Sequence, residues 1–182
     1  MSLLRRPVGR RRRVTAVAFL TSLVAGVAAV ASADPGHTPK VSGDWSNPVG
    51  ACIGHIIEVD PTTGDLLSCS GTSDWTGTWT GSTTWTLTGD ISLTAGGSGR
   101  IDEVFTGHSP DGRAGTLTFV EQFTLDATGH IDITGKIVDS SGQLAGSHGH
   151  AHWVGTANLD GSGRGTYSGR WHEGRRGYPK PS

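Results

Sequence analysis

The sequence predicts an all-β protein, an antiparallel up-and-down barrel of roughly eight strands with almost no helix after residue 33. Runs with a period of two residues, rich in Thr, Ile, Phe and Trp, recur between residues 74 and 171. Such alternation is typical of half-buried strands. Clusters of Gly, Asp, Ser and Pro separate the runs, as expected for hairpin turns. No ten-residue stretch has the 3.6-residue period of an amphipathic helix.

Seven strands are expected in this region, each ending at one of the turn clusters. A further strand between Cys52 and Cys69 brings the number to about eight. Short connections favour pairing between sequential neighbours, and about eight such strands close into a barrel that is filled by side chains or holds one small ligand. A sandwich of two sheets is the alternative. The seven expected strands are 75–80, 83–88, 100–107, 115–125, 130–138, 147–156 and 164–171.

Residues 1–33 have the pattern of a cleaved secretory signal peptide. Arginines within the first 13 residues form a basic start, Val14–Val30 is apolar, and Ala31-Ser32-Ala33 fits a small-residue cleavage site. A retained membrane helix is the alternative, although the apolar stretch is short and contains polar residues. We therefore expect a secreted protein, with the twin-arginine export route left open.

Cleavage after residue 33 would change the charge of the chain. Six of the 15 Lys and Arg residues are leader arginines, so nine would remain against 16 Asp and Glu, a net charge of −7 with His neutral. This balance argues against nucleic acid and anionic membranes as partners. The remaining length suits one domain. We expect an extended arm over 34–50, a barrel domain over 51–173 and a flexible tail over 174–182, as a monomer or small homo-oligomer.

The two cysteines of the chain, Cys52 and Cys69, predict a disulfide, because an exported protein meets an oxidising environment. Two short apolar runs flank the turn signal Asp60–Asp65 and form a predicted hairpin that pairs Ile56 with Cys69. Cys52 lies four residues before Ile56, so the bridge would tie the incoming arm back across the hairpin.

Three turn motifs carry a resemblance to a known family. The segments are Asp111–Phe119, with its Gly-Arg-x-Gly pattern, Phe123–Gly129 and Ser141–Gly146. Over residues 74–171 the chain resembles a bacterial domain-of-unknown-function family with an allene oxide cyclase-like barrel. The resemblance implies a calycin-type barrel but no common activity. His148 and His150 stand where that family carries Arg and Glu.

Two glutamates are predicted to share one face of neighbouring strands. A turn near Asp111 would place Glu103 opposite Phe119 and Ile101 opposite Glu121. The two carboxyls would then be diagonal neighbours about 5.5–8 Å apart. Glu103 also falls where the resembled family tends to carry a Glu.

A pair of this kind inside the barrel would be desolvated and like-charged, which raises at least one pKa. Glu103 and Glu121 are therefore the candidate catalytic residues for proton transfer. Two alternatives remain open: a register slip that turns both side chains to solvent, or a structural pairing with Arg100 or Arg113.

Aromatic side chains are the candidate walls of a ligand site. Indoles and phenyl rings at a barrel mouth can stack on a flat or apolar ligand, whereas ordinary core packing is the alternative. The candidate ligand-binding residues are Phe105, Phe119, Phe123, Trp75, Trp79 and Trp85.

The sequence His148-Gly-His150-Ala-His152 places three imidazoles on one face of a strand. Two histidines at i and i+2 can bind a metal ion, with zinc or copper favoured. A solvent-facing histidine stripe is the alternative, and no other cofactor is expected.

These observations favour a secreted barrel that binds a small apolar or amphipathic molecule. One alternative is a cofactor-free cyclase or isomerase that uses Glu103 and Glu121. Another is extracellular metal binding through His148, His150 and His152. The chain has no Gly-x-Ser-x-Gly elbow, phosphate-binding loop or dinucleotide fingerprint that would favour other chemistry.

Overall fold

A computed structural model describes residues 40–52, 56–59, 66–92, 95–158 and 160–174. The predicted signal peptide over 1–33, the turn Asp60–Asp65 and the tail beyond Gly174 lie outside these residues. Within the described ranges, no helix is long and apolar enough to cross a membrane.

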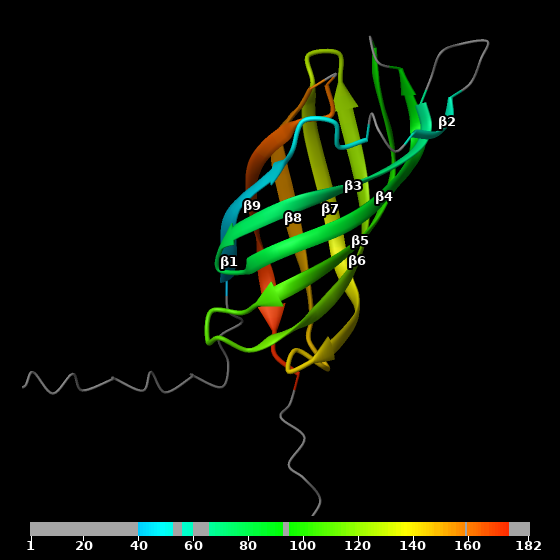
Figure 1. The fold of residues 1–182 in the computed structure, drawn as a ribbon. Coiled ribbons are helices and arrows are strands. Elements are labelled where there is room, and N and C mark those ends of the chain that lie inside the picture. The colour runs from blue at the N-terminus through cyan, green and yellow to red at the C-terminus, as the bar shows by residue number, and fades with distance from the viewer. Residues whose placement is uncertain (1–39, 53–55, 60–65, 93–94, 159, 175–182) are drawn as a thin grey trace, which may run out of the picture. The chain divides into compact units, whose positions relative to one another are not determined.

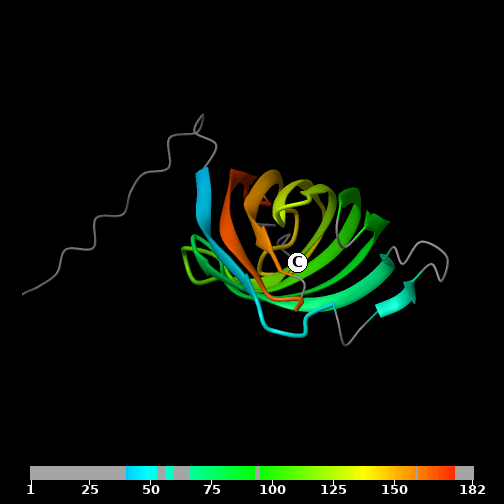
Figure 2. The ribbon, with the colours of Figure 1, turned by 90° about the horizontal axis from the view of Figure 1, so that it is seen from above.

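The described chain forms a single antiparallel sheet in which β2 to β9 pair in sequence order and β1 pairs with β9 (Figure 1). The sheet closes because β1 pairs with both β9 and β3, so β1 and β3–β9 form an eight-stranded up-and-down barrel while β2 flanks β3 (Figure 2). The predicted fold class is confirmed. The strands are β1 (Lys40–Asn47), β2 (Ile56–Val59), β3 (Leu66–Gly77), β4 (Thr80–Ser92), β5 (Gly96–His108), β6 (Ala114–Asp126), β7 (His130–Gly142), β8 (His148–Ala157) and β9 (Gly163–His172).

The barrel begins at Lys40, earlier than the expected boundary at residue 51. β1 lies within the expected arm, but it pairs along its length with β9 and, from Gly43 to Ser46, with the second half of β3. Its inward apolar residues, Val41 and Trp45, are separated by Gly43, so the apolar alternation that marks a strand is hidden.

The expected strand over 75–80 is wrong, because a tight turn interrupts it. β3 ends at Gly77 with a positive φ of 108°, which glycine adopts without steric cost, and β4 begins at Thr80. Trp79 lies in the connection, where its backbone N–H donates to the Tyr167 hydroxyl at 2.9 Å. The turn thus places the indoles of Trp75 and Trp79 one above the other, with ring centroids 6.0 Å apart.

The predicted disulfide joins Cys52 to Cys69, with the Cα atoms 5.1 Å apart. The predicted pairing of Ile56 with Cys69 is also confirmed. The bridge connects the segment after β1 to a fully buried position on β3. Closing a loop of this length stabilises a fold by about 3 kcal/mol in the chain-entropy model.

The two ends of the barrel differ in how their interiors are filled. We call the end that carries the β4–β5, β6–β7 and β8–β9 connections the upper end, which is at the top of Figure 1. The lower half is packed with aromatic rings around Trp79, whose centroid lies 5.9–6.1 Å from those of four neighbours. These neighbours are Phe105, Phe119, Tyr167 and Trp171. The upper half contains a cavity.

Candidate functional site

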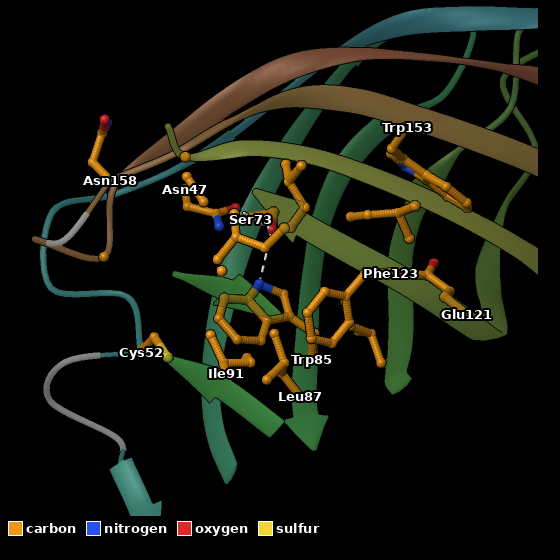
Figure 3. Close-up of a pocket in the computed structure, with 18 of the residues that line it drawn as sticks. Asn47, Cys52, Ser73, Trp85, Leu87, Ile91, Glu121, Phe123, Trp153 and Asn158 are labelled. Carbon is orange, nitrogen blue, oxygen red and sulfur yellow. Dashed lines mark hydrogen bonds between the residues drawn. The ribbon is translucent and has the colours of Figure 1, made fainter. Parts of the chain in front are cut away.

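The upper half of the barrel encloses a cavity of about 410 Å³ (Figure 3). This volume lies within the range of about 300–1,000 Å³ that is typical of small-molecule sites. Residues of β1 and β3–β8 line it, and the connections at the upper end form its mouth. Its walls are mainly apolar and comprise Trp85, Leu87, Ile91, Ile101, Phe123, Leu125, Ile131 and Ile133.

Aromatic packing seals the deep end of the cavity. Trp75 on β3 and Trp153 on β8 line the cavity from facing walls, with ring centroids 5.6 Å apart. Trp75 also lies 5.3 Å from Phe105 and 5.6 Å from Phe119, so the ring cluster of the lower half begins directly beneath it. A ligand would therefore enter from the upper end and stop at these indoles.

Three of the six predicted wall residues line the cavity, namely Trp75, Trp85 and Phe123. The other three, Trp79, Phe105 and Phe119, pack in the lower half and do not reach it. The positions of these three rings fit the alternative of core packing, because each contacts other rings of the lower half and none is among the residues that line the cavity.

Both predicted glutamates point into the barrel at the deep end of the cavity. The register places Glu103 opposite Phe119 and Ile101 opposite Glu121, as predicted. Glu103 is 5% exposed and Glu121 is 2% exposed, which excludes the register slip that would turn them to solvent. Both residues line the cavity.

The arginines considered as structural partners bind elsewhere. Arg100 lies on the outer face of β5 and forms an ion pair with Asp102. Arg113 forms ion pairs with Asp111 at 2.7 Å and Glu173 at 2.9 Å, in the β5–β6 connection and after β9. The alternative of a Glu–Arg pair inside the barrel is therefore wrong for both arginines.

The environment raises the pKa of both buried carboxyls. Burial raises the pKa of Glu103, and nearby Thr83 and Glu121 oppose part of that effect. Burial also raises the pKa of Glu121 well above its ordinary value, and the like charges of Glu103 and Asp102 raise it further. The protonated form of each carboxyl is therefore favoured more strongly in the cavity than in water.

A glycine on the neighbouring strand makes the position of Glu121 possible. Gly135 on β7 lies opposite Glu121. A Cβ at residue 135 would lie 2.6 Å from the Glu121 Cγ, closer than real contacts allow, and 3.2 Å from the Trp153 ring, which is a tight contact. The absent side chain lets the carboxyl and the indole lie side by side at the deep end.

A short hydrogen-bonded chain fixes one wall near the mouth. The Trp85 Nε1–H donates to the Ser73 hydroxyl at 2.9 Å, and that hydroxyl donates to the Asn47 Oδ1 at 2.6 Å. The chain links β4, β3 and β1, and Figure 3 shows the indole held beside Ser73. The Trp85 ring lies over Gly71, where a Cβ would collide with it.

Sequence reasoning missed Ser73, Asn47, Trp45 and Trp153 as cavity residues. The inward face of β3, with Gly71, Ser73 and Trp75 in alternation, is a signal that could have identified Ser73. No local signal marks Asn47, because it reaches the cavity only when β1 closes the barrel.

The three histidines lie on the outer face of β8 and away from the cavity. His148 stacks on His172 with ring centroids 4.8 Å apart, and His152 Nε2 lies 3.0 Å from Asp132 Oδ2. Within the described ranges, no group of three or more His, Cys, Asp or Glu side chains is arranged to hold a metal ion. The geometry therefore gives no support to metal binding through His148, His150 and His152.

The chain matches no protein-family model, and no curated protein is significantly similar to it. Function is therefore inferred from the cavity and its residues.

Replacing Glu121 by Gln should stabilise the protein at neutral pH, and this gain should fade toward acid. The folded-state pKa of Glu121 lies above its ordinary value of 4.5, so the folded protein binds more protons than the unfolded chain above that pH. The free energy of unfolding therefore falls as the pH rises from 4.5 through the folded-state pKa of Glu121. Gln cannot ionise, so the variant does not lose this free energy. Urea unfolding at a series of pH values measures the effect.

The matched control is Asp90→Asn, which removes an exposed carboxylate from the outer face of β4. If the wild-type and Glu121→Gln proteins showed parallel stability profiles from pH 4 to pH 8, the raised pKa would be contradicted.

Proposed function

We propose that this protein is an exported barrel that binds a small apolar or amphipathic organic molecule in the cavity at its upper end. The main evidence for this proposal is the cavity of about 410 Å³, which has apolar walls and two carboxyls at its deep end. Ligand sites in proteins typically combine such walls with a few convergent polar groups.

The contrast between the two halves of the barrel supports a ligand over loose packing. The lower half is packed to close ring contacts, as protein interiors usually are. An unfilled apolar cavity of this size forfeits dispersion contacts that a bound molecule would restore. Burying that molecule would add about 25 cal/mol for each Å² of apolar surface removed from water.

Export is the second part of the proposal. The leader pattern over 1–33 supports it but lies outside the described residues, and the Cys52–Cys69 bond is of the kind that persists in oxidising compartments. The mass of protein recovered from the culture medium tests it: a chain that begins at Asp34 is expected, and a full-length chain retained in cells would contradict it.

Filling the cavity mouth should weaken ligand binding without unfolding the barrel. Ala157 on β8 lines the mouth, whereas Thr156 beside it is exposed on the outer face. Ala157→Trp should weaken binding of the neutral fluorescent probe N-phenylnaphthylamine by at least about tenfold, because the indole would occupy the ligand's space. Fluorescence titration measures the affinity.

Thr156→Trp is the matched control, since it adds the same indole one residue away on the opposite face. Equal affinities for the wild-type, Ala157→Trp and Thr156→Trp proteins would show that the probe binds elsewhere and would contradict the proposal.

The two neighbouring buried carboxyls, Glu103 and Glu121, favour a second candidate, a cofactor-free isomerase or cyclase. With one of them protonated and the other ionised, the pair would provide a general acid and a general base at the same depth of the cavity. Chemistry of this type needs only a shaped pocket and one or two carboxyls.

Deuterium incorporation separates an enzyme from a carrier. An enzyme that moves protons through this pair should introduce deuterium at carbon when it is incubated in D₂O with an organic extract of its host's medium. Glu103→Gln should abolish the incorporation, whereas Asp90→Asn should leave it unchanged. Mass spectrometry reads the label, and its absence with the wild-type protein would contradict the enzymatic candidate while leaving ligand binding intact.

A further inference from the structure

The deep end of the cavity holds two carboxyl groups that no described basic side chain accompanies. Glu103 and Glu121 lie there, Asp126 lies at the mouth, and no described Lys, Arg or His side chain lines the cavity. The remaining charge that acts on Glu121 is also negative, from Asp102 on the outer face of β5. Buried charges in proteins are normally paired, so an ionised carboxyl at this site would need a counter-charge from a bound molecule.

One oxygen of the pair also lacks a hydrogen-bond donor. Glu121 Oε1 is buried and has no partner among the described residues. Figure 3 shows Glu121 at the deep end, beyond Phe123 and far from Cys52 and Asn158 at the mouth. An N–H group that reached this depth from within the cavity would satisfy the oxygen.

Aromatic rings surround the same space. Trp75, Trp85 and Trp153 line the cavity together with Phe123, and the Trp153 ring lies beside Glu121 across Gly135. The faces of indole rings attract cations, most strongly where water is excluded. The buried indole N–H groups of Trp45 and Trp153, which also lack partners, can bind a ligand oxygen but cannot neutralise a carboxylate.

We propose that the cavity takes an organic cation, an apolar skeleton that ends in an ammonium group placed beside Glu103 and Glu121 and against the indole rings. This inference rests on the proposed function, and it names the class of ligand. An ammonium would supply the positive charge that the described lining of the cavity lacks, together with an N–H donor for the unpartnered Glu121 Oε1. A carboxylate ligand would instead bring a further negative charge into the same low-dielectric space.

Three probes with one carbon skeleton test the charge preference: octylamine, octanol and octanoate. Each competes with bound N-phenylnaphthylamine at pH 7 and physiological ionic strength, and fluorescence measures the displacement. We expect octylamine to bind at least about tenfold more tightly than octanol, because it gains a charge-assisted hydrogen bond and a cation–π contact. Octanoate should bind more weakly than octanol.

The double variant Glu103→Gln/Glu121→Gln should remove the advantage of octylamine while leaving octanol affinity within about threefold, which also shows that the barrel is folded. The control Asp74→Asn/Asp90→Asn removes two negative charges from exposed outer positions of β3 and β4 and should keep the advantage.

Equal or tighter binding of octanol or octanoate to the wild-type protein would overturn the cation proposal and leave ligand binding standing. An octylamine advantage that survived in the Glu103→Gln/Glu121→Gln variant would also overturn it. Failure of N-phenylnaphthylamine and all three octyl probes to bind would overturn the proposed function as well.

Discussion

Closure of the sheet by β1 is the constraint on which the rest of the structure depends. β1 pairs with β9 along its length and with the second half of β3, so neither strand presents an open edge there. The same strand brings Trp45 and Asn47 to the cavity. Asn47 accepts a hydrogen bond from the Ser73 hydroxyl, which itself accepts one from the Trp85 indole. Removing β1 would open the barrel and one cavity wall together. The Cys52–Cys69 bond, directly after β1, holds this segment to β3.

The interior divides into a filled half and a hollow half, and the two glutamates lie at the boundary. Below them, rings pack around Trp79; above them, aliphatic residues and the Trp85 indole line an open space. Two carboxyls in such a place reduce stability at neutral pH, because the folded protein must desolvate them without a basic partner. Ionisable groups with strongly shifted pKa values are commonly found where proteins bind or transform a ligand. The position of the two carboxyls is therefore explained more simply by a role in ligand recognition than by a role in folding.

The sequence predicted some parts of this structure because the information is local. The register between β5 and β6, and with it the inward position of Glu103 and Glu121, follows from strict alternation on both sides of the short turn at Asp111. β1 escaped prediction because its inward residues are Val41 and Trp45 with a glycine between them. The turn at Gly77 was hidden within an apparently regular alternation. Ser73 and Asn47 meet only through barrel closure, which pairs segments distant in sequence, and no local pattern reports such contacts.

The most direct test of the central claim is native mass spectrometry of the untagged protein from its host's culture medium, alongside the Ala157→Trp protein produced in the same way. The account predicts a one-to-one organic adduct on the wild-type protein that is released on denaturation and is absent from the variant. Recovery of each protein at its own ligand-free mass, before and after exposure to an organic extract of that medium, would contradict the account.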